Sequence, residues 1–301
     1  MEKQKVGIPR GLYYYFFGDL YVKFFENLGL ETIISPPSNQ LILKKGTDCA
    51  VDEMCLPMKL VLGHISYLKD KCDYIVLPRI DNYGLSNQTC TYFLALYDIV
   101  QNMDDFTLLN YNIDEAHGED EIDGFLKMGR ILGFRDIDIL KCYENAKEYA
   151  DDKKRKKCLR NYKNLSKKNK KILLVSHPYN TYDEMIGKPI VQYLESLGMT
   201  VIYSDAFDEK LSMQKAKLLS EELYWKYSKE ALGSIPLSKD RIDGIIFLSS
   251  FPCALDSLAY ELAMRKIKKP YLYLTVDDLN SLTGIETRIE SFVDILEQKV
   301  V

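Results

Sequence analysis

Residues 49–64 read CAVDEMCLPMKLVLGH, and they contain the start of a predicted helix. Pro57 fits the first turn of a helix, because an amide hydrogen there would have no partner within the helix. Cys55 lies two residues earlier, so its thiol is expected at the helix N-terminus. Backbone N–H groups and the helix dipole favour a thiolate there, and Lys59 would lie one turn further along the same face. This setting favours a metal-bound or a reactive sulfur, and the stretch by itself leaves both open.

Strands and helices alternate on either side of this stretch. Short apolar runs predict strands, whereas apolar residues at helical spacing predict helices, and Gly29 supplies a helix stop. Residues 78–89 are predicted to form a loop. The predicted strands are residues 5–8, 31–34, 74–77 and 106–109, and the predicted helices are residues 12–28, residues 57–69 and one that begins near residue 92. This alternation indicates an α/β protein with mostly parallel sheets covered by helices.

The second half of the chain repeats the first. FENLGLETIIS at residues 25–35 matches LESLGMTVIYS at residues 194–204 without a gap, and the same offset relates Pro9 to Pro178. DYIVL, from Asp73, likewise matches DGIIF, from Asp243. A repeat on the scale of a domain indicates two copies of one fold, and a single large sheet is the alternative. We therefore predict two tandem Rossmann-like lobes with parallel sheets, residues 1–113 and 170–301, joined by a helical, charged segment, residues 114–169.

Composition restricts the class of protein. The 301 residues are 47% hydrophobic and 28% charged, with a net charge of −4, which is typical of a soluble globular protein. We find no signal peptide and no apolar run long enough for a membrane helix, so we expect a cytoplasmic protein without membrane contact. Residues 147–171 hold twelve Lys or Arg and three acidic residues. A solvated helix face explains such a run better than nucleic-acid binding does.

Seven cysteines are spread along the chain, and an odd number without an export signal argues against disulfides. Cys90 and Cys253 follow the two matching strands that begin after Asp73 and Asp243. Because open α/β sheets bind ligands at the carboxyl ends of their strands, we expect Cys55, Cys90 and Cys253 to face one cleft. The remaining cysteines are expected to pack as small buried side chains; they are Cys49, Cys72, Cys142 and Cys158.

Several common motifs are absent from the sequence. No G-x-G-x-x-G follows the first predicted strand of either lobe, and no G-x-x-x-x-G-K-[ST] occurs anywhere. The sequence also lacks H-E-x-x-H, a zinc-like C-x-x-C pair and G-x-S-x-G. A standard dinucleotide, P-loop, metallohydrolase or serine-hydrolase site is therefore not expected, and ATP hydrolysis would fall to a partner protein.

The sequence resembles the 2-hydroxyacyl-CoA dehydratase D-component-like proteins, in the branch that accompanies ATP-dependent activases and is related to double-cubane cluster reductases. The matching segments cover both predicted lobes: IPRGLYYY, LGLETIISPPSN, DEMCLPMKLVLGH, YIVLPRI, SHPYNTYD, SSFPCALDSL and TGIETRIESFVDIL. Two positions depart from the family pattern. Thr91 follows Cys90, where proline is common, and DDLNSLTG replaces an acidic-His-Thr-Gly run.

The resemblance implies an oxygen-sensitive [4Fe-4S] cluster, or a bridged double cubane, that an ATP-dependent activase reduces. It implies Cys55, Cys90 and Cys253 as the ligands, with an acyl-CoA substrate and a homologous subunit as further partners. Thiolates suit iron-sulfur clusters, and three of them would leave one iron of a cubane open to act as a Lewis acid. The alternative is that the cysteines bind no metal or a different one.

Other polar residues are candidates for supporting roles. Glu53, Lys59 and His64 are the candidate catalytic residues, although charged residues near a helix start can be a solvated cap and a histidine can be half-buried and structural. Arg10 and His177 each follow the first strand of a predicted lobe and could contact a ligand. Two further sets complete the candidates: Thr287, Arg288 and Glu290 match the last family motif, and His117 is expected at the surface.

Three hypotheses follow from the sequence. The first is an iron-sulfur protein that accepts low-potential electrons from an ATP-dependent activase for reductive or radical chemistry, such as dehydration of a 2-hydroxyacyl-CoA. The second is a non-catalytic subunit or assembly factor of such a system, which fits the modest length and the altered motifs. The third is a nucleic-acid binder that uses the basic middle helices.

Overall fold

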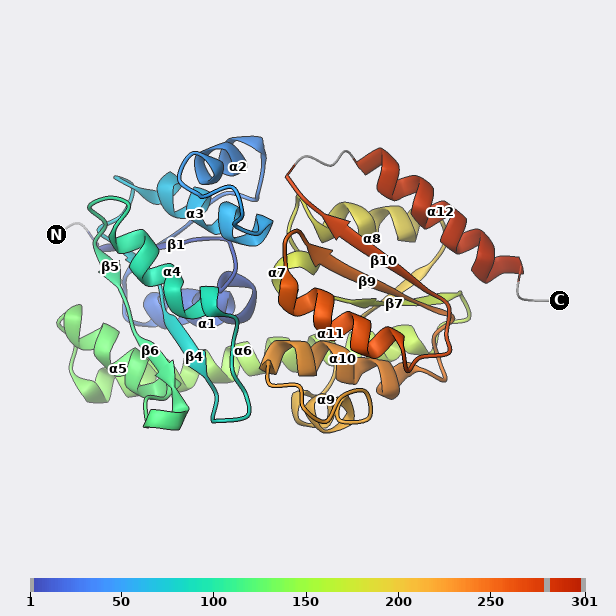
Figure 1. The fold of residues 1–301 in the computed structure, drawn as a ribbon. Coiled ribbons are helices and arrows are strands. Elements are labelled where there is room, and N and C mark those ends of the chain that lie inside the picture. The colour runs from blue at the N-terminus through green and yellow to red at the C-terminus, as the bar shows by residue number, and fades with distance from the viewer. Residues whose placement is uncertain (1–2, 279–281, 299–301) are drawn as a thin grey trace. The chain divides into compact units, whose positions relative to one another are not determined.

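The computed structural model describes residues 3–278 and 282–298, and the chain divides into two compact units, residues 1–153 and 154–301. Each unit is built on one parallel four-stranded sheet (Figure 1). Within the described residues no helix is both long and apolar enough to cross a membrane. The predicted α/β class, with parallel sheets and helices around them, is confirmed.

The first unit has the strand order β2-β1-β3-β5. Its main strands are β1 (Lys5–Ile8), β2 (Glu31–Ile34), β3 (Tyr74–Val76) and β5 (Leu108–Leu109), and its helices are α1 (Tyr14–Asn27), α2 (Gln40–Thr47), α3 (Leu56–Leu68), α4 (Thr91–Gln101) and α5 (Glu121–Ile131). A second parallel pair joins β4 (Arg79–Asn82) to β6 (Asn112–Asp114), followed by a 3-10 turn, Glu115–His117. The prediction of a loop over residues 78–89 is therefore wrong in its first part, because strand pairing with a distant segment is not a local signal.

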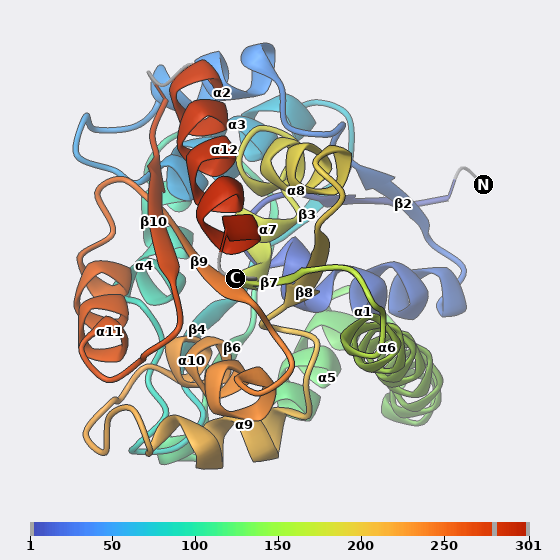
Figure 2. The ribbon, with the colours of Figure 1, turned by 90° about the vertical axis from the view of Figure 1, so that its right-hand side faces the viewer.

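The second unit has the strand order β10-β9-β7-β8, and Figure 2 shows these strands side by side. Its strands are β7 (Lys171–Val175), β8 (Thr200–Tyr203), β9 (Gly244–Ser250) and β10 (Tyr271–Val276), and its helices are α7 (Pro178–Thr181), α8 (Gly187–Ser196), α9 (Glu209–Ala216), α10 (Lys226–Ser238), α11 (Ala254–Met264) and α12 (Leu282–Gln298). Helices α10 and α11 cover one face of the sheet, while α8 and α12 cover the other (Figures 1 and 2).

The two sheets are copies of one topology, since β2-β1-β3-β5 and β8-β7-β9-β10 place equivalent strands in the same order. In each copy an aspartate that precedes the third strand accepts a 2.7 Å hydrogen bond from the first residue of the first strand. In each sheet the second strand is added on one side of the first strand, and the third and fourth strands are added on its other side, so the order of strand addition switches between the first and third strands at the centre of the sheet. This switch point is where open α/β sheets form ligand sites.

The register of the copies differs from the sequence alignment in one place. Ser35 N donates to Ile8 O, and the equivalent Ser204 N donates to Leu174 O, so Ile8 corresponds to Leu174. The gapless match of Pro9 with Pro178 is therefore wrong for the first strand. By the same register Gly11, and not Arg10, takes the place of His177.

The segment that we expected to be a charged connector, residues 114–169, contains the 3-10 turn, α5 and all of α6 (Asp136–Leu165). Phe125 of α5 is fully buried in the first unit, with its ring centroid 4.7 Å from that of Phe24. Further along α6, Lys154 pairs with Glu209 of the second unit at 2.6 Å. The segment thus belongs in part to the core of the first unit and in part to the second.

Candidate functional site

Cys55, Cys90 and Cys253 share one structural position. Each is the N-cap residue of a helix, with an extended backbone: Cys55 precedes α3, Cys90 precedes α4 and Cys253 precedes α11. Pro57 lies in the first turn of α3, as its sequence position predicts. Each sulfur is partly exposed at the end of a helix where unpaired N–H groups and the dipole favour an anion. The helix starts therefore suit thiolates at all three positions.

The first unit brings Cys55 and Cys90 to a common neighbour, Tyr92. The pKa of Tyr92 is raised mainly by burial, and the second-largest contributions come from the charges of the Cys55 and Cys90 thiolates. The charge of Glu53 acts in the same direction. Two cysteines that are 35 positions apart in the sequence thus affect the same phenol. An anionic centre at these sulfurs would lie near Tyr92 and the exposed carboxylate of Glu53.

The candidate catalytic residues of α3 are buried. Lys59 is only 8% exposed, and His64 is fully buried, where its Nδ1 and Nε2 atoms lie 2.9 Å and 3.1 Å from the hydroxyls of Ser35 and Ser38. Burial and then the charge of Arg10 lower the pKa of His64 to about 3. His64 is therefore neutral at pH 7, and its two ring nitrogens tie α3 to the segment after β2.

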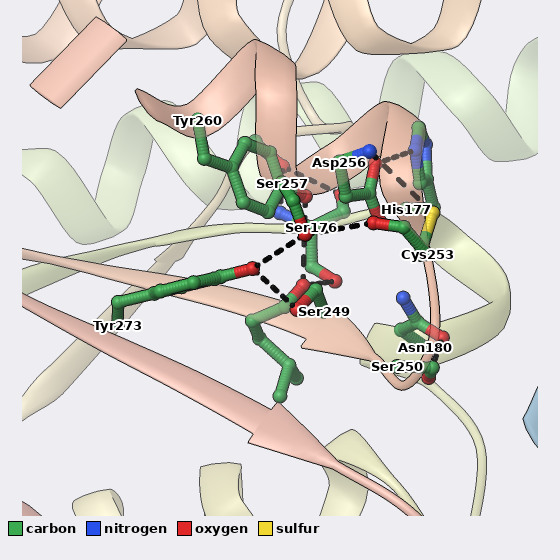
Figure 3. Close-up of polar contacts among 12 residues, drawn as sticks. Ser176, His177, Asn180, Ser249, Ser250, Cys253, Asp256, Ser257, Tyr260 and Tyr273 are labelled. Atoms are coloured by element: carbon green, nitrogen blue, oxygen red, sulfur yellow. Dashed lines mark hydrogen bonds and ion pairs between the residues drawn. The ribbon is translucent and has the colours of Figure 1, made fainter. Parts of the chain in front are cut away.

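In the second unit Cys253 lies beside a buried His-Asp pair (Figure 3). The backbone N–H of Asp256 donates to Cys253 Sγ at 3.4 Å, as an N-cap side chain receives a bond from the first turn. The carboxylate of Asp256 is 2.7 Å from Nε2 of His177. His177 follows β7 and Cys253 follows β9, so the group lies at the switch point of this sheet.

The His177–Asp256 pair places two titratable side chains in the interior. The two side chains are 7% and 1% exposed. Burial, the largest influence, opposes protonation of His177, but the charge and hydrogen bond of Asp256, with the charge of Glu230, outweigh it and raise the pKa of His177. The stability from this raised pKa is present below the usual histidine pKa and is lost as the pH rises through the raised value.

Unused hydrogen-bonding groups surround this pair. Within the part of the chain that the structure describes, the buried side-chain atoms without a hydrogen-bond partner include His177 Nδ1, Asn180 Nδ2, Thr181 Oγ1 and Asp256 Oδ2. The amide oxygen of Asn180 accepts from Ser250, which anchors Asn180 to the end of β9 (Figure 3). A concentration of unsatisfied polar atoms is unusual in a folded protein and is typical of functional sites.

Three of the other cysteines behave as neutral thiols. Cys72 and Cys158 donate to the backbone carbonyls of Leu68 and Phe207, each at 3.5 Å. Burial raises the pKa of Cys72 to about 11 and also raises the pKa values of Cys142 and Cys158. The prediction that Cys49 is buried is wrong, because Cys49 is exposed. Cys253 differs from Cys72 and Cys158 because it is an N-cap residue whose sulfur accepts an N–H from the first turn of its own helix.

The described residues include no group of three or more His, Cys, Asp or Glu side chains arranged to hold a metal ion. The three expected cysteines come from different units: Cys55 and Cys90 belong to the first, and Cys253 to the second. Thiolate sulfur is the donor that iron-sulfur clusters take, so each of the three cysteines is of the chemical type that such a cluster needs.

Comparison with known proteins identifies the family. Residues 5–207 match the family model described as CoA enzyme activase uncharacterised domain (DUF2229). The chain belongs to this family. The activase-domain match includes Cys55, Cys90 and His177, whereas Cys253 and Asp256 lie beyond it. A search of curated proteins found no match.

Solved structures add little to the activase-domain assignment. A metal-free mutant of a periplasmic metal-binding protein from Candidatus Liberibacter asiaticus is 12% identical with a TM-score of 0.30, covering 98% of this chain and 99% of that one. The SBP FpvC from Pseudomonas aeruginosa, in complex with Mn2+, is 12% identical with a TM-score of 0.29, covering 98% of each chain. At these TM-scores neither likeness carries an argument about this chain.

The remaining candidate residues of this family member form hydrogen bonds or ion pairs with neighbouring residues. His117 is exposed and pairs with Asp114 at 2.7 Å, and Arg288 donates to the carbonyl of Tyr273 at 2.6 Å. Arg10 N donates to Ser35 Oγ at 2.7 Å. Three further contacts involve the last family motif and the basic middle run: Glu290 accepts from Tyr193, Lys154 pairs with Glu209, and Lys157 pairs with Asp205.

Sequence reasoning missed Asp256 as a site residue. Its signal is the spacing C-x-x-D, which places an acidic residue in the first turn after a cysteine N-cap, by analogy with the capping box. The partner of Asp256, His177, is 79 positions away in the sequence, so only the fold reveals the pair. Asn180 was also missed, because a lone asparagine after a strand has no distinctive pattern.

Proposed function

We propose that this member of the activase-associated family is an iron-sulfur protein that accepts low-potential electrons from an ATP-dependent activase. Cys55, Cys90 and Cys253 are the proposed ligands of a [4Fe-4S] cluster, with a bridged double cubane as the larger alternative. Such a cluster supplies electrons and, where one iron has no protein ligand, a Lewis acid. The proposed chemistry is reductive, such as radical dehydration of a 2-hydroxyacyl-CoA.

One observation carries this proposal: the three cysteines that the family resemblance selects are N-cap residues of helices. Ligand cysteines bind metal as thiolates, and a helix N-terminus stabilises an anion through its backbone amides. By contrast, Cys72 and Cys158 donate their thiol hydrogens to carbonyls, which is the behaviour of a neutral thiol. The structural difference between these groups matches the proposed division into ligands and packing residues.

An activase partner is supported by the family and by the absence of a nucleotide motif. The family model is described as a CoA enzyme activase domain, and the sequence has no P-loop. Glu53 is an exposed carboxylate whose charge acts on Tyr92, as those of Cys55 and Cys90 do, and we propose that it sets the local charge around the cluster. Lys59 keeps its proposed charge role one turn into α3. His64 is left out of the proposed chemistry, because it is neutral and both ring nitrogens are engaged.

The test is anaerobic purification and reconstitution of the full chain, followed by iron and sulfide assays and absorption spectra. One cubane predicts about four irons per chain. Cys55→Ser, Cys90→Ser and Cys253→Ser are each expected to lower the iron content substantially. Cys158→Ser is the matched control, because Cys158 is half-buried and hydrogen-bonded to a carbonyl, and iron content is expected to stay at the wild-type level.

Two outcomes would decide between the rival hypotheses. A wild-type protein that holds no iron after reconstitution, or that loses as much iron with Cys158→Ser as with Cys253→Ser, would overturn the proposed cluster. Iron binding and co-purification with an activase, without turnover of any 2-hydroxyacyl-CoA, would favour the non-catalytic subunit or assembly factor.

A further inference from the structure

Arg10 is a half-buried arginine in the loop that leads from the carboxyl end of β1 to α1. Its Nε atom is buried without a hydrogen-bond partner, and its Cζ atom lies 5.4 Å from the centroid of the Tyr14 ring. Among residues 3–278 and 282–298, no carboxylate forms an ion pair with its guanidinium. A cation that is partly removed from water normally has an anionic partner. The chain itself supplies none for Arg10.

The backbone of Arg10 is held firmly in place. Its N–H donates to Ser35 Oγ at 2.7 Å, and the same hydroxyl lies 2.9 Å from Nδ1 of the buried His64. The next residue, Gly11, packs so closely against α3 that a Cβ there would lie 3.0 Å from Val61. The guanidinium is therefore carried by a preorganised loop, which lowers the entropy cost of binding a ligand.

The second unit shows that the fold does not need a cation at this position. Ser176 takes the place of Arg10, because the N–H of each residue donates to the serine that follows the second strand, Ser204 or Ser35. Ser176 is fully buried, and its hydroxyl donates to the carbonyl of Leu248 at 2.6 Å. A small neutral side chain with an internal partner thus satisfies the same place in the duplicated fold. Stability therefore does not account for the arginine of the first unit.

We propose that Arg10 anchors an oxyanion-binding site in the first unit, which takes the phosphate or carboxylate group of a small molecule. β1 lies between β2 and β3, so Arg10 follows the strand at which the order of strand addition switches, where open α/β sheets bind ligands. A guanidinium presents parallel N–H groups that match two oxygens of either group. The ring of Tyr14 supports the cation from one side. The proposal goes beyond the iron-sulfur function and does not depend on it, since neither residue is a proposed ligand of the cluster.

The first test uses the wild-type, full-length, iron-free protein. Phenylglyoxal modifies arginine side chains, and mass spectrometry of the peptides measures the modification of Arg10 and of the exposed Arg160 in the same sample. Inorganic phosphate and acetate are the probes, compared with chloride at the same pH and ionic strength. At about ten times the Kd of a probe, the modification rate of Arg10 is expected to fall roughly tenfold, because only about a tenth of the sites are then empty. The rate at Arg160 is expected to stay unchanged.

The two probes distinguish the sources of the oxyanion. Protection by phosphate alone assigns the site to a phosphate-bearing ligand, protection by acetate alone assigns it to a carboxylate, and protection by both assigns it to the oxyanion that the two share. Protection by neither probe, or equal protection of Arg10 and Arg160, would overturn the proposal.

Titration calorimetry with the protecting probe then compares three variants. Arg10→Gln is expected to weaken binding by roughly 10- to 100-fold, as for loss of a hydrogen bond to a charged group, and Arg10→Lys, which keeps the charge without the fork, is expected to fall between. Arg130→Gln is the matched control, because Arg130 is an exposed arginine of the same unit that pairs with Asp136. A folded Arg10→Gln protein that binds the probe as tightly as the wild type would also overturn the site. Because no iron is present, the result is independent of the proposed cluster.

Discussion

Replacement of the buried His64 gives the sharpest stability prediction for the first unit. His64 is fully buried in α3, and its ring nitrogens hold the hydroxyls of Ser35 and Ser38. The variant His64→Gln keeps one donor and one acceptor at this position but removes the titrating imidazole. The equivalent position in the second unit is Ser234, which shows that the fold accepts a neutral polar side chain there.

The magnitude follows from the pKa of His64 in the two states. Burial, with the charge of Arg10 second, lowers the pKa from 6.5 to about 3. Between these two pKa values the unfolded chain binds one more proton than the folded chain. The free energy of unfolding therefore falls by about 1.4 kcal/mol for each unit by which the pH is lowered. The effect is absent above pH 6.5, grows as the pH decreases, and ends near pH 3. At pH 5 it is worth about 2 kcal/mol.

Urea unfolding at pH 7.5 and pH 5.0 tests this, with the wild type compared with His64→Gln. The wild-type protein is expected to lose about 2 kcal/mol more than the variant between the two pH values. Any packing cost of glutamine appears at both pH values, and the other titrating groups are common to both proteins, so both contributions cancel in the comparison. Equal pH dependence of the two proteins would refute the assignment of His64 as a buried neutral residue.

Two further predictions concern packing and buried charge. Gly63→Ala places a Cβ 2.0 Å from the carbonyl oxygen of Ile42, so the contact between α2 and α3 must open at a cost of about 1–3 kcal/mol. Gly284→Ala has open space at its Cβ and is expected to stabilise α12 by up to about 1 kcal/mol. Urea unfolding measures both changes. Lys226→Met removes the cation from the largely buried Glu230, while Glu209 keeps its pair with Lys154, and is expected to cost about 3 kcal/mol in thermal and urea unfolding. Arg265→Met, which breaks an exposed pair, should have no measurable effect.

Local sequence signals predicted the main sheet and the starts of the key helices. The apolar runs at residues 5–8, 31–34 and 74–77 coincide with β1, β2 and β3 to within one residue. β1 and β3 are largely buried, and β2 is a partly exposed strand at the edge of the sheet. Pro57 marked the start of α3 correctly, since proline is favoured where no amide donor is needed. Gly29 ends α1 with a φ of +81°, which a glycine adopts without strain.

Features that depend on distant residues were not predictable in this way. The pairing of β4 with β6 joins two short segments whose burial alternates along each strand, but each contains a single apolar residue, which is too few for the sequence to show that alternation. The Pro9–Pro178 alignment was wrong because a gapless match across the first loop hides a change of register. The His177–Asp256 pair spans 79 positions, and its chemistry exists only once β7 and β9 lie side by side.

Equivalent helices of the two units begin with different residues. Gly63 and Gly233 each place the backbone of a long helix against a carbonyl of the preceding one, which identifies α3 with α10. By this equivalence Trp225 caps α10 where Cys55 caps α3.

The two helices also differ within their first turns. In α10, Lys226 and Glu230 form a buried ion pair, whereas leucines fill the corresponding positions of α3. A buried ion pair lies at the start of α10, whereas apolar side chains pack at the start of α3, which Cys55 precedes as the N-cap residue. The two copies therefore differ in the cysteines at their helix starts, since Cys55 and Cys90 precede helices of the first copy and Cys253 precedes a helix of the second.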